Sequence, residues 1–163
     1  EAIDKDVFRS LTNLKILNLY NNQLSSLDPD IFAYIPHLSE LNLSGNNLKI
    51  QKNTFLYLKR LKKLNLEENR VGSTLGNEIF STLTSLEELN LNKNQIEKIN
   101  GDMLKGLRNL RKLSLCENDS LEFENDAFSL MNNLKLVFVN KKVMAHLKEK
   151  EFKIRYPNIF FKY

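Results

Sequence analysis

The chain holds few of the side chains with which enzymes do chemistry. It has two histidines, His37 and His146, and a single cysteine, Cys116. Nucleophilic catalysis needs a nucleophile, a base and an orienting group brought together. His37 precedes a leucine in a turn, Cys116 lies in a strand-like segment and His146 lies near the C-terminus, so we expect them on three different surfaces. The sequence therefore predicts that the protein is not an enzyme.

The sequence also lacks the residues that are typical of metal and nucleotide sites. One cysteine excludes a disulfide within the chain and a metal site of zinc-finger type. The five glycines are dispersed at positions 45, 72, 76, 101 and 106, so no glycine-rich phosphate loop exists. We expect no metal, cofactor or nucleotide.

Positive charge is concentrated at the C-terminus. Residues 1–140 contain 17 Lys and Arg against 18 Asp and Glu, whereas residues 141–163 contain 7 against 2. Basic residues mixed with aromatic ones can grip phosphates and stack on bases. Because Glu149 and Glu151 interrupt the run, we interpret it as a solvated face and expect no nucleic-acid partner.

The elements that position these residues follow from an internal repeat. The pattern Leu-x-x-Leu-x-Leu-x-x-Asn recurs five times, followed by a degraded sixth copy, and the copies begin at Leu14, Leu38, Leu61, Leu86, Leu110 and Leu134. These leucines are separated by 24, 23, 25, 24 and 24 residues. A fixed period of this length is typical of a solenoid.

A second half-pattern lies between the copies, with apolar residues spaced by three. It includes Phe8, Leu11 and Leu14, then Phe32, Ile35 and Leu38, and it continues in this way to Phe128, Met131 and Leu134. Such spacing suits a turn of helix. Both half-patterns of the repeat, over about residues 1–140, resemble the leucine-rich repeat family in its 24-residue form, which has a phenylalanine on the outer side.

The resemblance implies an α/β fold: a right-handed, horseshoe-shaped solenoid with a parallel concave β-sheet and short helical or 3-10 turns on the convex side. Within each copy the Leu-x-Leu alternation points Leu17 and Leu19 inward and Asn18 and Tyr20 outward. The asparagine at position nine can donate and accept hydrogen bonds where the chain turns inside. We therefore predict a structural ladder of Asn22, Asn46, Asn69, Asn94 and Asn118.

The two ends differ from the repeats between them. Ile3 to Leu14 already form the outer half of a repeat, so we expect further chain before them. Lys142 stands at the ladder position of the sixth copy, where a buried lysine would be unfavourable, so the repeats should end near residue 140.

Residues 141–163 are expected to form a C-terminal cap. Met144 to Phe152 predict a short helix with Val143, Leu147 and Phe152 on one side, followed by an aromatic-rich tail. We interpret the cap as a lid over the last repeat. Exposed apolar surface often marks a contact, so a dimer or heteromer formed through this cap is the alternative.

The concave face offers candidate ligand-binding residues. Before the second leucine of each copy, the order Glu40, Lys63, Glu88, Lys112 alternates in charge, and so does the order Glu68, Lys93, Glu117, Lys141. We expect these rows to pair along the sheet rather than to form a charged groove. Between them runs a polar strip, either solvated or facing a ligand. The predicted contact residues are Tyr20, Asn42, Asn65, Glu67, Asn90, Asn92 and Phe138.

The resemblance implies a non-catalytic module that binds a protein partner through its concave face, in extracellular recognition, innate immunity or adhesion. The alternatives are a cytoplasmic scaffold or inhibitor, because the cysteine-rich caps of secreted relatives are lacking, and a structural spacer in a larger receptor. No apolar stretch approaches the roughly 18 residues of a membrane span. Two glycosylation sequons begin at Asn42 and Asn118.

Overall fold

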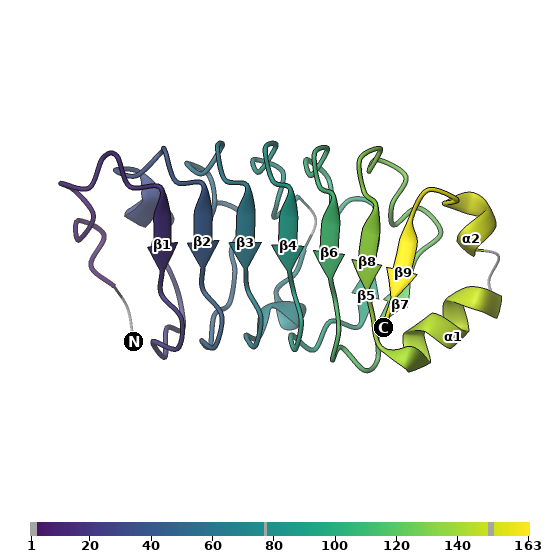
Figure 1. Ribbon diagram of the computed structural model, residues 1–163. Coiled ribbons are helices and arrows are strands. Elements are labelled where there is room, and N and C mark those ends of the chain that lie inside the picture. Colours follow the sequence, from purple (N-terminus) through teal and green to yellow (C-terminus); the bar gives the residue numbers. More distant parts are fainter. Residues whose placement is uncertain (1–2, 77, 150–151) are drawn as a thin grey trace.

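The protein forms an elongated stack of parallel strands, seen in a computed structural model (Figure 1). The structure describes residues 3–76, 78–149 and 152–163, without the side chains of residues 146, 148, 149 and 153. The main sheet has the order β1-β2-β3-β4-β6-β8-β9. Its strands are β1 (Ile16–Asn18), β2 (Glu40–Asn42), β3 (Lys63–Asn65), β4 (Glu88–Asn90), β6 (Lys112–Ser114), β8 (Leu136–Phe138) and β9 (Phe160–Lys162).

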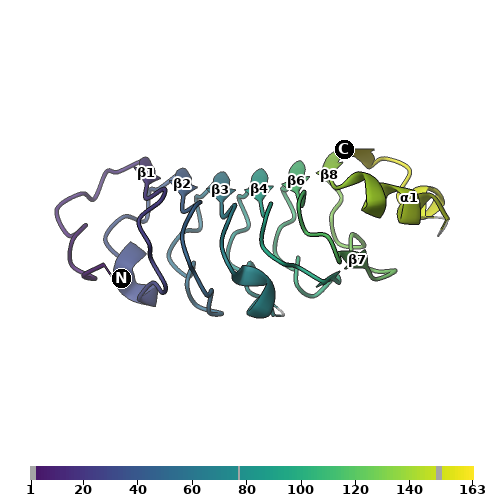
Figure 2. The same ribbon diagram turned by 90° about the horizontal axis from the view of Figure 1, so that it is seen from below.

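The register of this sheet follows the sequence repeat. Leu17 pairs with Leu41, and the same column continues through Leu64, Leu89 and Leu113 to Val137. From Leu41 to Val137 these side chains are buried. Figure 2 shows the strands in one row and the return segments on the other side of the core. The predicted solenoid with a parallel sheet is confirmed.

The return segments consist mainly of successive turns. In the repeat that contains Phe55, Leu58 N donates to Phe55 O at 3.1 Å and Leu61 N donates to Leu58 O at 3.1 Å. Only η1 (Pro29–Phe32) and η2 (Val71–Ser73) are 3-10 helices in the described chain. Burial of the phenylalanine column adds to the core, and the rings of Phe55 and Phe80 stack with centroids 6.2 Å apart. A short second sheet of β5 (Lys98–Ile99) and β7 (Glu122–Phe123) was not predicted.

The asparagines at position nine connect each repeat to the one before it. Asn118 Oδ1 accepts from Asn94 N and Ile96 N at 3.0 and 2.9 Å, while its Nδ2 donates to Leu91 O at 3.0 Å and to Leu115 O at 2.9 Å. Corresponding bonds from the side chain to the preceding repeat are made by Asn46, Asn69 and Asn94. Each therefore satisfies buried backbone groups of two turns at once.

Asn22 differs from the other ladder asparagines. Its side chain is exposed and its Nδ2 donates to Tyr20 O at 3.0 Å within its own turn. The described chain places no earlier strand beside β1 for it to reach. Among the described residues Asn22 therefore makes no side-chain bond to a preceding repeat, and its place in the ladder stays a prediction.

The C-terminal segment contains α1 (Lys141–Glu149), α2 (Phe152–Arg155) and β9. α1 begins three residues before the predicted helix, and Lys142 lies exposed on it. Val143, Met144, Leu147 and Phe152 are buried against the last repeat. Phe152 contacts Phe128 and Tyr156, with ring centroids 5.9 and 5.0 Å apart.

β9 was not predicted as a strand. It pairs in parallel with β8, where Val137 lies opposite Phe161. The tail therefore covers the last repeat and also adds a seventh strand to the concave sheet.

Substitution of a buried ladder asparagine should destabilise the protein. Asn118→Ala strands the backbone groups bonded to its side chain and should lower the free energy of unfolding by about 1–3 kcal/mol. Asn22→Ala is the matched control and should change it by less than about 0.5 kcal/mol. Urea titration followed by circular dichroism measures both, and equal losses would contradict the assigned roles.

Candidate functional site: the concave sheet surface

The concave surface is a shallow groove along the strands. A groove of about 420 Å³ is lined by residues of β1, β2, β3, β4 and β6, among them Asn18, Asn42, Asn65, Asn90 and Ser114. These five residues occupy one column of the sheet, because Asn18 pairs with Asn42 and the register is kept to Ser114. A ligand lying along the groove would meet the same sheet position in successive repeats.

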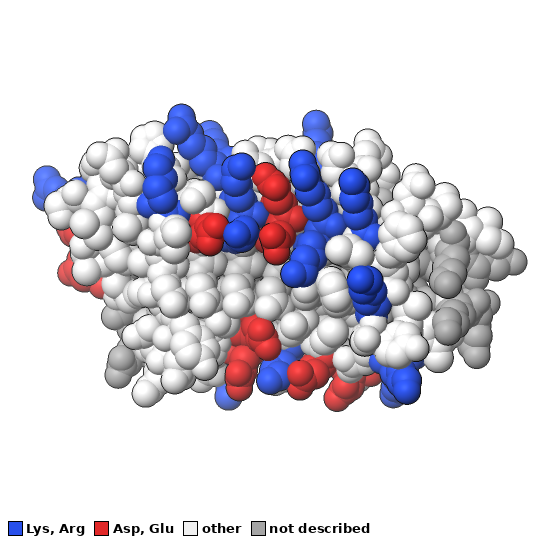
Figure 3. Space-filling view, in the orientation of Figure 1, with Lys and Arg blue, Asp and Glu red and all other residues white. Residues whose placement is uncertain are grey.

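Charged side chains on this face pair with each other, as expected. Lys63 Nζ lies 2.9 Å from Glu40 Oε1, and Lys112 Nζ lies 3.6 Å from Glu88 Oε2. The hydrogen bond to Glu40 raises the pKa of Lys63. In the second row, Lys93 Nζ lies 3.8 Å from Glu117 Oε1. Figure 3 shows an uncharged band between the upper and lower charged rows.

The asparagines of this band use their carbonyl oxygens within the protein. Asn42 Oδ1 accepts from Ser44 N at 3.0 Å and from Ser44 Oγ at 2.7 Å. Asn65 Oδ1 accepts from Glu67 N at 3.0 Å. What these side chains offer a ligand is therefore mainly their Nδ2 donors. The band is suited to acceptors such as peptide carbonyls.

Three predicted contact residues lie together in the middle of the face. Asn90 Nδ2 donates to Glu67 Oε2 at 3.0 Å. Asn92 lies in the next turn, where its Oδ1 accepts from Cys116 N at 2.8 Å. Glu67 and Asn92 follow adjacent strands, β3 and β4, at the same edge of the sheet. These hydrogen bonds hold the carboxylate and amides in fixed positions.

The two predicted aromatic contacts are not brought together. Tyr20 follows β1 and Phe138 ends β8, five rungs apart, or about 24 Å at the usual strand spacing. Tyr20 is 57% exposed, and its ring lies close to the backbone of Gly45. Phe138 is half-buried, with Lys112 Nζ 5.6 Å from its ring centroid. A single small ligand does not span both rings.

Ile16 is an exposed groove residue that the sequence interpretation left out of the contact set. It is 62% exposed and stands at the position that Glu40 and Lys63 occupy in the next two strands. An apolar residue in a charged column was the signal that could have identified it. With Tyr20, it makes the β1 end of the face apolar, as Leu136, Phe138 and Phe160 do at the β8–β9 end.

The candidate groups for catalysis lie apart. His37 precedes β2 and its Nδ1 lies 2.8 Å from Arg60 Nη1. Cys116 follows β6, three rungs away and at the opposite ends of the strands. The side chain of His146 lies outside the described part. The described residues contain no group of three His, Cys, Asp or Glu side chains placed to hold a metal ion.

The described part of the chain also contains no helix of the length and apolar character needed to cross a bilayer.

Comparison with known proteins gives the family. A family model described as leucine rich repeat matches residues 1–48, 49–96, 59–119 and 84–141. The chain belongs to the leucine-rich repeat family.

Two similar sequences are known proteins. Lumican of Gallus gallus is 32% identical over 136 residues, which are 82% of this chain and 32% of lumican. Toll-like receptor 8 of Homo sapiens is 32% identical over 133 residues, which are 76% of this chain and 13% of the receptor. The chain thus spans less than a third of either relative.

A similar solved structure is the crystal structure of a TLR13–ssRNA13 complex. Its TM-score is 0.75 at 28% identity, and the match covers 83% of this chain and 20% of that one. The likeness extends over most of the strand stack.

The Cys116 thiol should react slowly in the folded protein. Burial, and next the charge of Glu117, raise its pKa above the ordinary value, so less thiolate is present near neutral pH. Alkylation by iodoacetamide should be slower than for the unfolded chain, and the rate should keep rising above the pH at which a free thiol ionises. Equal rates for the native and denatured protein would contradict this.

Proposed function

We propose that this chain is a non-catalytic binding module that holds a protein partner on the concave sheet surface. The observation that carries the proposal is the uncharged band of amide donors along the groove, bordered by charges that pair with each other. Because Glu40–Lys63 and Glu88–Lys112 are internally paired, a partner would not have to separate these charges from water. Glu67 would be desolvated with the hydrogen bond from Asn90 Nδ2 as its support. Amide donors suit the backbone carbonyls of a protein segment.

The proposed contact residues form a polar centre with one aromatic residue at each end. Tyr20, at the β1 end, is an exposed aromatic side chain of the type that anchors protein interfaces. Asn42, Asn65, Glu67, Asn90 and Asn92 supply the polar centre. Phe138 extends the surface toward the cap, beneath the ammonium group of Lys112.

The setting that we propose is extracellular recognition, including innate immunity. Support comes from similarity to a protein named as a receptor, Toll-like receptor 8. Asn42 is the sequon that a glycan could reach, since Asn118 is only 1% exposed and its amide is bonded inside the turn. A glycan on Asn42 would lie in the groove and would remove Asn42 from the contact set. Mass spectrometry of the native protein tests this setting: a glycan or a removed signal peptide supports it, and an unmodified cytosolic protein favours the intracellular scaffold.

The expected absence of a nucleic-acid partner is not supported by the comparisons. A structure similar to this chain is that of TLR13 in complex with ssRNA13. The fold is therefore compatible with a polyanionic ligand. The proposal of a protein partner rests on the uncharged band of the concave surface alone.

Changing the concave surface should abolish partner capture. Together, Tyr20→Ala, Glu67→Lys and Phe138→Ala remove two aromatic contacts and reverse a central charge, and they should weaken binding by about 100-fold or more. Affinity capture from extracellular fluid, quantified by mass spectrometry, measures the loss.

The matched control changes exposed residues outside the groove, with Leu56→Ala, Glu122→Lys and Leu130→Ala. Partner capture should be unchanged in this variant. If the concave variant captures the same partners as the unmodified chain, the spacer interpretation replaces the proposal.

A further inference from the structure

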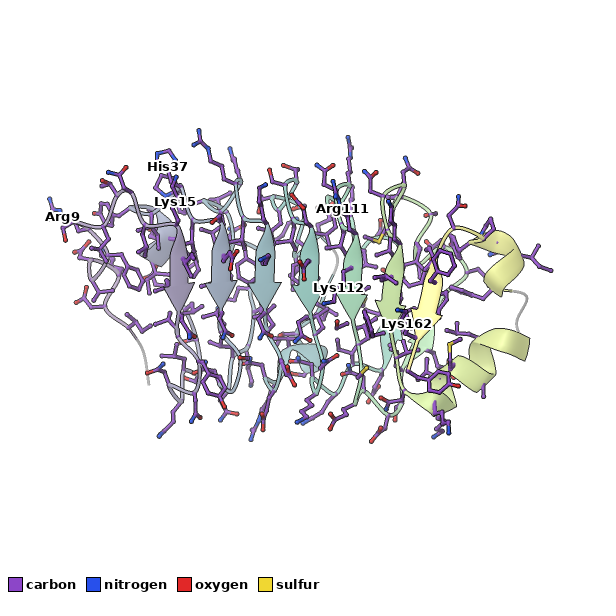
Figure 4. The ribbon with its side chains drawn as sticks, viewed as in Figure 1. Arg9, Lys15, His37, Arg111, Lys112 and Lys162 are labelled. Atoms are coloured by element: carbon purple, nitrogen blue, oxygen red, sulfur yellow. The ribbon has the colours of Figure 1, made fainter. Side chains whose placement is uncertain are left out.

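One edge of the solenoid is strongly basic. We define the strand-entry edge as the six segments that lead into β1, β2, β3, β4, β6 and β8, residues 12–15, 36–39, 59–62, 84–87, 108–111 and 132–135. They contain seven Lys and Arg residues and a single acid, Glu87. Lys and Arg side chains line the upper margin of the molecule in Figure 3, and Figure 4 places Lys15, His37 and Arg111 on that side.

Backbone hydrogen bonds hold the last residues of these segments in consecutive rungs. Ser39 N donates to Lys15 O at 2.8 Å, and Lys62 N donates to Ser39 O at 2.8 Å. The series continues from Glu87 and Arg111 to Lys135, whose N donates to Arg111 O at 3.0 Å. Four of the six positions in this column are therefore Lys or Arg.

Most of these cations have no acidic partner. In the described structure the salt bridge of this edge is Lys62 to Glu87, with Nζ 3.3 Å from Oε1. Lys15, Arg111 and Lys135 are exposed, and none of them belongs to a salt bridge within the described residues. The edge thus differs from the concave rows, where the cations are neutralised by neighbouring carboxylates.

The opposite edge is less basic. The segments that leave the same six strands, residues 20–23, 44–47, 67–70, 92–95, 116–119 and 140–143, contain four acids and four basic residues. Like charges that gather on one edge add to a potential that attracts anionic ligands. The strand-entry edge, with seven basic residues against one acid, is therefore the edge that attracts anions.

We propose that the strand-entry edge binds a linear sulfated polysaccharide. Lys15, Lys62, Arg111 and Lys135 stand on the first, third, fifth and sixth rungs of this column, so they span about 24 Å at the usual strand spacing, and of the four only Lys62 is paired within the described residues. Such separated cations suit an extended chain that carries anionic groups at intervals of a few sugar rings. Asn109 and Asn133 accompany them as polar side chains in the same turns, each donating to the backbone of the preceding repeat.

The composition of the edge favours a sulfated sugar over a nucleic acid. Single-stranded nucleic acids are held by aromatic rings that stack on bases. The six segments contain no Phe, Tyr or Trp. The guanidinium groups of Arg60, Arg108 and Arg111 could also stack, and of these Arg60 already contacts His37 Nδ1 at 2.8 Å. This site is separate from the concave band and does not depend on the function proposed for that band.

The test compares two variants with equal loss of charge. The edge variant is Lys15→Gln, Arg111→Gln, Lys135→Gln, and the control is Lys49→Gln, Arg70→Gln, Lys142→Gln, which changes exposed cations away from the edge. Affinity for heparin, a sulfated polysaccharide, is measured at several salt concentrations. Thermal melting verifies that all three proteins are folded.

The edge variant should bind heparin about 10- to 100-fold more weakly at low salt, and the slope of log affinity against log salt should fall by about 2. The control should lose less than about threefold. Equal losses in both variants would show that net charge alone attracts the polyanion and would overturn the site. Tighter binding of single-stranded RNA than of heparin at the same salt would overturn the sulfated ligand. Partner capture by the edge variant reports on the concave band independently.

Discussion

The constraint on which this structure depends is the burial of irregular backbone in every turn of the stack. After each strand the chain bends inward, and its N–H and C=O groups lose water without gaining a strand partner. One asparagine per repeat meets both needs, because its amide accepts from the preceding turn and donates to that turn and to its own, as Asn118 does. The repeats are thereby joined at these turns as well as along the strands, and the spacing between repeats is fixed. Every surface column follows from that spacing.

The period of the sequence was sufficient to predict the sheet register, because leucines that recur about every 24 residues take the same position in successive turns of a stack. Leu17, Leu41 and Leu64 pair as expected. The period also extends further than the leucines do: Val137 and Phe161 are 24 residues apart and pair in β8 and β9. β9 was not predicted because aromatic residues stand there in place of the leucines, and because helices precede it in place of turns. The β5–β7 pair was missed because residues 98–99 and 122–123 fall between the two half-patterns, where neither of them predicts an element.

The candidate site could be predicted less completely than the fold. The alternation of charge predicted the Glu40–Lys63 and Glu88–Lys112 pairs, because adjacent rungs place these side chains within reach. It did not predict that Lys112 would also lie over Phe138, or that Asn90 would donate to Glu67. Those contacts depend on which way each side chain turns. The basic edge is not visible in the net charge, because residues 1–140 are almost neutral as a whole.

The basic edge is a consequence of parallel strands. All strands of such a sheet begin at the same side, so a mild preference for Lys or Arg before each strand accumulates along one margin. In an antiparallel sheet the same preference would be divided between two margins and would largely cancel. Lys15, Arg111 and Lys135 are 24 or more residues apart in sequence, yet they belong to one surface. The uncharged band of the concave surface, by contrast, is bordered by charges that are already paired. The two surfaces therefore differ in their response to salt, since screening weakens attraction to exposed unpaired charges far more than contact with neutral amides.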